Sequence, residues 1–220
     1  MFAKQLITDE IIPLKTSDSG AQALAFMDDY KLAHLPIVNN VEYLGMISEE
    51  DIFVLNSFEE PLGNHQLSLS NTFVYEYQHV FEVLKLIAEH KLTVVPVIDD
   101  KNNYQGCISA QNLIEKLANV YSVDQPGGLI ILEIHEKNYS LSEIAQIVES
   151  NHARIMSMNI TSDPDSTVME VAIKINQLEI QPIIQTFNRY NYAIKLSVSE
   201  AEDYDDLREN YDSLMNYLNI

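Results

Sequence analysis

The amino-acid sequence predicts an α/β (α+β) protein with two repeated helix–strand–strand–helix units, a second domain of order βαββαβ, and an acidic helix at the C-terminus. Three observations carry this prediction. A nine-residue stretch recurs about sixty positions later, the strand pattern changes after a Pro-Gly-Gly segment, and apolar residues return at helical spacing near the end of the chain. We therefore expect the repeats over 1–120, a linker over 121–128, the second domain over 129–199 and the helix over 200–220.

Composition restricts the class of protein and its partners. The 220 residues include 33 Asp and Glu against 13 Lys and Arg, which gives a formal net charge of −20. Nucleic acids and anionic membranes are bound through basic patches, so we expect neither as a partner. The single cysteine excludes an intrachain disulfide and a cysteine-based metal centre. With no signal-like N-terminus and no apolar run long enough to span a bilayer, the sequence predicts a cytoplasmic protein.

The repeat sets the order of elements in the first half. Residues 30–38 read YKLAHLPIV, and residues 90–98 read HKLTVVPVI. Apolar residues at helical spacing precede each copy, which predicts a helix followed by a strand. Two units of about sixty residues, 1–60 and 61–120, are therefore expected.

The end of each unit is also repeated. A polar turn follows each strand, and a second short apolar run containing Gly45 or Gly106 comes next, which predicts a hairpin. A serine, Ser48 or Ser109, then opens a second helix.

This pattern resembles the cystathionine-beta-synthase (CBS) domain, and the tandem pair resembles a Bateman module. The resemblance is carried by a helix followed by Leu-Pro-Ile-Val or Val-Pro-Val-Ile, by Gly-hydrophobic-Ile-Ser, and by a polar residue three positions after the serine. It implies a pseudo-twofold module whose clefts bind AMP, ADP, ATP, S-adenosylmethionine or cyclic di-AMP. It also implies a regulatory module and not an enzyme. The six histidines show no HExxH or paired-ligand spacing, and no carboxylates are spaced as an acid/base pair, so the sequence predicts no metal site, no catalytic residues and no required cofactor.

The resemblance assigns ribose binding to the residue three positions after each serine. These residues are Asp51, after Ser48, and Asn112, after Ser109. A carboxylate can accept hydrogen bonds from both ribose hydroxyls, whereas asparagine keeps an acceptor but loses the charge. Ser-x-x-Asp is also nearly a helix capping box, which satisfies N–H groups of the first turn without a ligand. Both roles are compatible with the sequence.

The adenine slot is expected among strand residues, because adenine is an apolar plate with polar edges. An ordinary core is the other interpretation of the same residues, and it is the one that the sequence favours. Two prolines among them leave the strand edge open, with backbone groups that an adenine edge could use. The candidates are Ile11, Ile12, Leu35 and Pro36 in the first copy and Phe73, Val74, Val95 and Pro96 in the second.

Charge distinguishes the two clefts. Glu49, Glu50 and Asp51 place three carboxylates at the start of one helix, where the helix dipole would otherwise favour an anion. A low-charge adenosine compound or a magnesium-shielded nucleotide is therefore expected there in preference to bare ATP. The second cleft has Ala-Gln-Asn at the same place and Lys101 in the preceding turn, so it repels phosphate less.

The second half reads as a ferredoxin-like domain. An apolar strand follows Pro126-Gly127-Gly128, and the Ser140 to Glu143 capping box opens a helix. Two alternating strands, a second helix and a last strand complete the order. A domain of this order after a CBS pair resembles the ACT domain, which commonly binds amino acids at subunit interfaces. Its ligand loop, residues 135–140, lacks the family's glycine here, so we expect this domain to dimerise.

The chain ends in a segment with amphipathic spacing. Acidic residues surround Leu207, Tyr211, Leu214, Met215 and Leu218, which lie at helical spacing. This pattern predicts an acidic helix that packs on its own domain or across a dimer.

Two functions follow from these observations. The first is a cytoplasmic regulatory sensor in which an adenosine ligand changes the arrangement of domains or of a dimer. The second is a ligand-free dimerisation scaffold. The expected partners are the small-molecule ligand, a second copy of the chain and a regulated protein.

Overall fold

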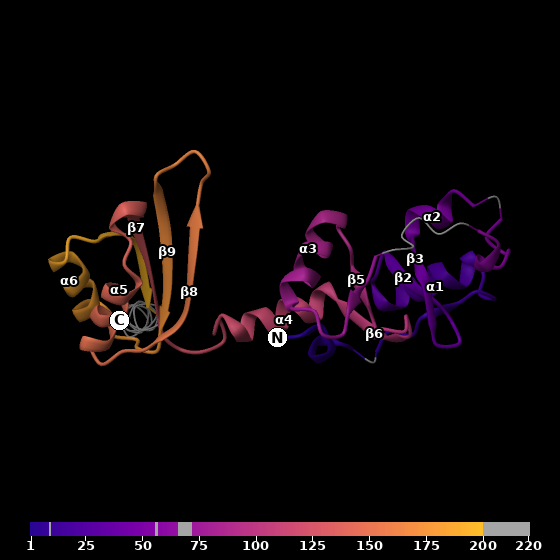
Figure 1. Ribbon diagram of the computed structural model, residues 1–220, viewed down its shortest axis with the longest axis horizontal. Helices are drawn as coiled ribbons and strands as arrows, with labels where there is room; N and C mark the ends of the chain where they lie inside the picture. Colours follow the sequence, from indigo (N-terminus) through magenta and orange to yellow (C-terminus); the bar gives the residue numbers. More distant parts are fainter. Residues whose placement is uncertain (9, 56, 66–71, 200–220) are drawn as a thin grey trace, which may run out of the picture. The chain divides into compact units, whose positions relative to one another are not determined.

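The computed structural model describes residues 1–8, 10–55, 57–65 and 72–199 (Figure 1). The chain divides into two compact units between Lys116 and Leu117. The C-terminal helix predicted over 200–220 lies outside the described residues. None of the described helices is long and apolar enough to cross a membrane.

The first unit contains the predicted order of elements twice. Each repeat forms a three-stranded sheet in which a two-residue strand pairs in parallel with the first strand of an antiparallel hairpin. The elements of the first repeat are η1 (Ala3–Leu6), β1 (Leu14–Lys15), α1 (Gly20–Tyr30), β2 (His34–Asn39), β3 (Glu42–Ser48) and α2 (Glu49–Phe53). Those of the second are η2 (Leu62–Asn64), β4 (Val74–Tyr75), α3 (Val80–His90), β5 (Val94–Ile98), β6 (Tyr104–Ser109) and α4 (Ala110–Val120).

The short parallel strands begin later than the sequence suggested. Ile11 and Ile12 were predicted as strand residues, but they precede β1, and Phe73 precedes β4. In the first repeat the reason is Pro13, which has no N–H to donate, so the parallel ladder starts at Leu14.

Serines determine where two of the helices in the first repeat begin. The Ser19 side chain accepts a hydrogen bond from the N–H of Gln22, and the Ser48 side chain accepts one from the N–H of Asp51. Both helices therefore begin with a capping box, as the sequence predicts for α2. At its other end α1 stops at Lys31, which takes the left-handed conformation with φ 55°.

The segment that precedes each repeat in the chain packs on the other repeat. The N–H of Ala3 donates to the carbonyl of Gln78, at 2.9 Å, so the start of the chain packs on the second repeat. In the opposite direction, the N–H of Leu62 donates to the carbonyl of Asp18, at 2.8 Å. We call residues 1–8 the leading segment of the first repeat. Its exchange with the matching segment of the second repeat ties the two repeats into one unit.

The leading segment continues along the edge of the second sheet. Thr8 forms an antiparallel bridge with Cys107 in β6, and its N–H donates to the Cys107 carbonyl at 2.9 Å. Ile7 lies against Gly106, which has φ +140° and no side chain. A Cβ at this glycine would overlap the Cγ2 atom of Ile7, so the close approach requires glycine.

The second unit has the predicted order βαββαβ. Its antiparallel sheet has the order β10-β7-β9-β8, and both helices lie on one face (Figure 1). The core between sheet and helices includes Ile130, Val171, Ile183 and Phe187, all fully buried. The elements are β7 (Gly128–His135), η3 (Glu136–Asn138), α5 (Leu141–Ser150), β8 (Ile155–Ser162), β9 (Val168–Ile175), α6 (Gln181–Arg189) and β10 (Ala193–Ser199).

The glycines of the Pro-Gly-Gly segment have a packing role. A Cβ at Gly127 would overlap the carbonyl oxygen of Ile175, and Gly128 is already the first residue of β7. The strand therefore begins one residue inside the predicted linker.

We predict that Gly106→Ala lowers the free energy of unfolding by about 2 kcal/mol or more, because the new methyl group overlaps Ile7 and the backbone is held in a conformation that alanine disfavours. Urea denaturation followed by circular dichroism measures the change. In an Ile7→Ala background the same substitution should cost less, since the overlapping Cγ2 atom is gone. Equal stability of Gly106→Ala and wild type would contradict the proposed contact.

Candidate functional site

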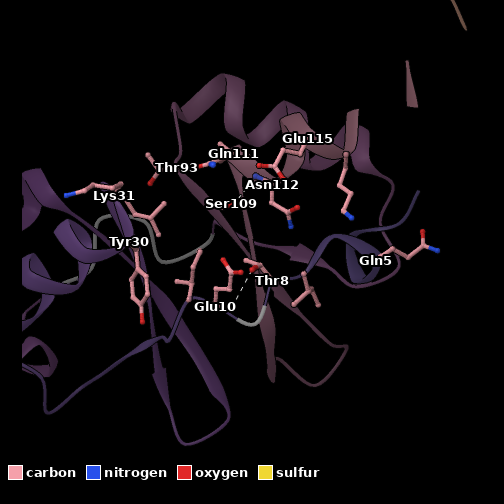
Figure 2. Close-up of a pocket in the computed structure, with 15 residues that line it drawn as sticks. Gln5, Thr8, Glu10, Tyr30, Lys31, Thr93, Ser109, Gln111, Asn112 and Glu115 are labelled. Carbon is pink, nitrogen blue, oxygen red and sulfur yellow. Dashed lines mark hydrogen bonds between the residues drawn. The ribbon is translucent and has the colours of Figure 1, made fainter. Parts of the chain in front are cut away.

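A cleft of 660 Å³ lies between the two repeats of the first unit (Figure 2). This volume is within the usual range for small-molecule sites. Its walls come from both repeats: the leading segment and the end of α1 on one side, and Thr93 and the start of α4 on the other. The leading segment contributes Gln5, Ile7 and Thr8, and Ile11 follows it. The last residue of β6, Ser109, and the first three residues of α4, Ala110, Gln111 and Asn112, also line the cleft.

The start of α4 presents polar groups to this cleft. Ser109 Oγ accepts a hydrogen bond from the N–H of Asn112 at 3.1 Å, as a helix cap does. The Asn112 amide Nδ2 donates to the carbonyl of Leu6 at 3.2 Å, which anchors the leading segment to α4. Because the amide nitrogen is used in this way, Oδ1 is the atom of Asn112 suited to accept a hydrogen bond from a ligand hydroxyl.

The charge around the cleft is balanced. The first turn of α4 contains no acidic residue, so its positive dipole end is not neutralised by a side chain. Glu10 and Glu115 line the cleft, and so do Lys31 and Lys116; all four residues are exposed. The cleft therefore has both a helix N-terminus and cationic side chains with which it could accept an anion.

The equivalent serine of the first repeat forms the predicted capping box. Ser48 Oγ donates to Asp51 Oδ2 at 2.7 Å, the Ser48 N–H donates to the same oxygen at 2.9 Å, and the Asp51 N–H donates to Ser48 Oγ at 3.1 Å. Residues 66–71 lie outside the described residues. The hydrogen bonds with Ser48 give Asp51 a capping role.

Three of the predicted binding residues line the described cleft: Ile11, Ser109 and Asn112. Five others, Leu35, Pro36, Val74, Val95 and Pro96, are buried and line none of it. They pack as core, which is the other interpretation of these residues.

Two further predicted adenine contacts also lie elsewhere. The Phe73 ring makes edge-to-face contacts with Tyr43 and Tyr75. Ile12 is 60% exposed and does not line the cleft.

The two strand prolines interrupt no ladder. Pro36 and Pro96 lie one residue before the point where the parallel partner strand begins, since β1 pairs from Ile37 and β4 pairs from Val97. A missing N–H on that side of the strand therefore costs no ladder hydrogen bond.

Sequence reasoning assigned each cleft to residues of a single copy, whereas the structure builds this one from both copies. It thereby missed Thr8 and Lys31, which line the cleft together with Gln111. The exchange of leading segments that brings Thr8 to α4 leaves no local pattern in the sequence. The hydrophobic spacing alone could not have found it.

A contact between the repeats lies beside the cleft. The Thr93 N–H donates to His34 Nδ1 at 3.4 Å, and Thr93 Oγ1 lies 3.1 Å from the same nitrogen. Thr93 Oγ1 also accepts the N–H of Ala33 at 3.1 Å. Burial lowers the pKa of His34, while the nearby carboxylates of Asp51 and Glu50 act in the opposite direction. The neutral ring is the form whose Nδ1 can accept.

Neither a thiol nucleophile nor a metal centre emerges among the described residues. Burial raises the pKa of the Cys107 thiol to about 11, so it stays protonated, as predicted from its apolar strand. Within residues 1–8, 10–55, 57–65 and 72–199, no group of three or more His, Cys, Asp or Glu side chains could hold a metal ion.

Comparison with known families matches the first unit. The family model of the CBS domain matches residues 3–55 and 70–119, once over each repeat. These residues are slightly under half of the chain, and they support the predicted tandem CBS pair.

A curated relative matches the same half of the chain. Inosine-5'-monophosphate dehydrogenase of Methanocaldococcus jannaschii is 22% identical over 117 residues, 52% of this chain. The match spans only 23% of that enzyme.

Solved structures give two similar folds. A CBS domain pair/ACT domain protein from Thermotoga maritima has a TM-score of 0.49 at 23% identity, covering 54% of this chain and 98% of that one. CBSX2 in complex with AMP has a TM-score of 0.48 at 18% identity, covering 54% of this chain and 97% of that one.

We predict that the His34–Thr93 contact weakens in acid. The folded pKa of His34 is lowered, so the folded state binds fewer protons than the unfolded state, and this contribution to stability is lost as pH falls below the unfolded value of about 6.5. Unfolding free energies of wild type and His34→Asn, measured by urea denaturation at pH 7.5 and pH 5.5, test this. Asparagine keeps an acceptor but does not titrate, so the advantage of wild type should shrink at the lower pH. An equal advantage at both values would refute it.

Proposed function

We propose that this protein is a regulatory sensor that binds an adenosine-containing ligand in the cleft at the start of α4. The observation that carries the proposal is the composition of this cleft. It combines a helix N-terminus without acidic residues, capped by Ser109, with apolar and polar side chains from both repeats. The match of both repeats to the CBS domain supports a regulatory role.

The cleft offers a suitable group for each part of an adenosine nucleotide. Ile7, Ile11 and Leu32 provide apolar surface for the adenine ring. Asn112 Oδ1 is the acceptor for a ribose hydroxyl, in the position that the CBS resemblance assigns to that role. The N–H groups of the first turn of α4 are the donors for a phosphate.

Charge favours a ligand with few phosphates. Glu10 and Glu115 line the same cleft as Lys31 and Lys116. Each added phosphate would therefore be attracted by the two lysines and repelled by the two glutamates. Of AMP, ADP and ATP, AMP has the least negative charge and is repelled least by the two glutamates. ADP and ATP are expected to bind better when magnesium neutralises part of their charge.

A ligand in this position would act on the arrangement of the chain. It would contact the leading segment of one repeat and α4 of the other, so binding favours one relative placement of the two repeats. Helix α4 begins at the cleft, and the boundary between the two units falls within it, after Lys116. A ligand that moved the first turn of α4 would therefore act on a helix whose last residues belong to the second unit.

One observation favours the second function, a dimerisation scaffold without ligand. The polar groups at both serine motifs already have partners in the protein: Asp51 is held by Ser48, and the Asn112 amide nitrogen by Leu6. The homodimer, the ACT-like role of the second unit, the cytoplasmic location and a regulated protein partner stay predictions from the sequence.

A thermal-shift screen tests the sensor. The ligands are AMP, ADP and ATP, each with and without magnesium, S-adenosylmethionine and cyclic di-AMP. A ligand at a hundredfold excess over its Kd stabilises the folded state by about 2.7 kcal/mol, so binding should raise the melting temperature measurably. No shift with any of them, in protein shown to be folded, would refute the sensor and favour the scaffold.

A pair of variants then assigns the site. Asn112→Ala should weaken binding about tenfold in calorimetric titration, as expected for the loss of one hydrogen bond. Asp51→Ala is the matched change in the other repeat, and it should leave this site unchanged. If only Asp51→Ala weakened binding, the ligand would occupy the other cleft.

A further inference from the structure

The sheet of the second unit has one face that α5 and α6 leave open, and this face is apolar along β10 and the first half of β7. Side chains alternate along β7 and β9, and those pointing to one face form the core with α5 and α6. The opposite face carries a contiguous apolar patch, because Val198 pairs with Leu129 and Leu196 pairs with Ile131 across β10 and β7. Ala172 of β9 extends the patch beside Ile131. We call these five residues the open-face patch.

This patch is more exposed than a sheet interior. Leu196 is 47% exposed and Val198 is 42% exposed, although both are paired with residues of β7. The described contacts on this face are polar and lie around the patch: Ser157 Oγ donates to the carbonyl of Tyr121, and Lys195 pairs with Glu170. The other three residues of the patch, Leu129, Ile131 and Ala172, are half-buried, and contiguous apolar surface of this kind marks a docking surface.

The chain itself supplies a segment of matching chemistry. Twenty-one residues, 200–220, follow directly after Ser199, the last residue of β10. Their apolar side chains from Leu207 to Leu218 recur at helical spacing, so a helix here would have one apolar stripe. The acidic residues of the segment would face away from the sheet.

The dimensions of segment and sheet agree. A helical stripe from Leu207 to Leu218 would be about 17 Å long. The open-face patch lies on three adjacent strands, β10, β7 and β9, whose outer two are about 10 Å apart, so a stripe of this length covers the patch across its width. The seven residues between Ser199 and Leu207 can reach about 23 Å when extended, which is enough to bring the stripe back over the sheet.

We propose that residues 200–220 dock on the open-face patch of their own chain. A second copy could cover the same patch, but the tethered segment is present at an effective concentration of roughly millimolar, whereas a second copy must associate from solution. At micromolar protein concentration, docking of the tethered segment is therefore favoured over binding of a second copy. The second unit then resembles a sheet with a helix layer on each face.

Thiol labelling in the full chain tests this proposal. Leu196→Cys is introduced in a Cys107→Ala background, so that the new thiol is the only one, and its rate of reaction with a maleimide is measured. Leu214→Asp with Leu218→Asp, which puts charge into the apolar stripe, should raise this rate about tenfold by releasing the segment. Ser213→Asp with Asn216→Asp adds the same charge on the opposite side of the predicted helix and should leave the rate unchanged.

The controls separate docking from unfolding and from dimerisation. Asn188→Cys, on the exposed surface of α6, should react at the same rate in all of these backgrounds if the unit stays folded. Protection of Cys at position 196 that rises with protein concentration and survives Leu214→Asp with Leu218→Asp would identify a second copy and overturn the proposal. A thiol at 196 that reacts in the unaltered tail as fast as one at 188 would overturn it as well.

Discussion

The approach of Ile7 to Gly106 is the contact on which the first unit depends. It allows the leading segment to run along β6, where Thr8 pairs with Cys107, before the chain turns back to form its own repeat. Apart from this exchange, the two sheets meet through their hairpins, where Glu42 bridges Asn103, and through the His34–Thr93 contact. The cleft would also lose one wall, because Ile7 and Thr8 line it. Stability and the candidate site thus share one steric requirement, a residue without Cβ at position 106.

Acidity has different consequences at two equivalent helix starts. Helix α2 carries Glu49, Glu50 and Asp51 in its first turn, whereas α4 carries no acidic residue there. Acidic side chains stabilise a helix N-terminus by themselves, which leaves less of the dipole for a bound anion. The first repeat therefore uses its helix start for stability. In the second repeat, Asn112 at the equivalent position donates a hydrogen bond to the leading segment, and the helix start remains available to a ligand in the cleft.

The sequence was sufficient for elements whose signals are local and insufficient where two distant segments meet. The repeat of HLPIV as VVPVI and the Ser48 box predicted β2, β5 and the start of α2, because periodicity and capping act within a few residues. Spacing could not show that Thr8 and Asn112 face one cleft, since their proximity arises from the exchange of leading segments. Leu35 and Val95, which the sequence offered as adenine contacts or as core, are both fully buried in the central strand of their sheets.

If the proposed ligand binds, the continuity of α4 limits how its effect can leave the first unit. A helix of eleven residues behaves as a rigid rod about 16 Å long, because every interior residue is hydrogen-bonded to its neighbours. Its first turn meets the leading segment through Asn112 and Leu6, and its side chain Leu113 is fully buried in the first unit. A ligand that displaced the Asn112–Leu6 bond would thus act on a helix held at its first turns. Rotation of that helix would be resisted at Leu113, so the softer response is a shift of the leading segment, which Ile7 and Thr8 would transmit to β6. Communication between the repeats consequently needs only the segment that joins them, whereas communication with the second unit needs α4 itself to move.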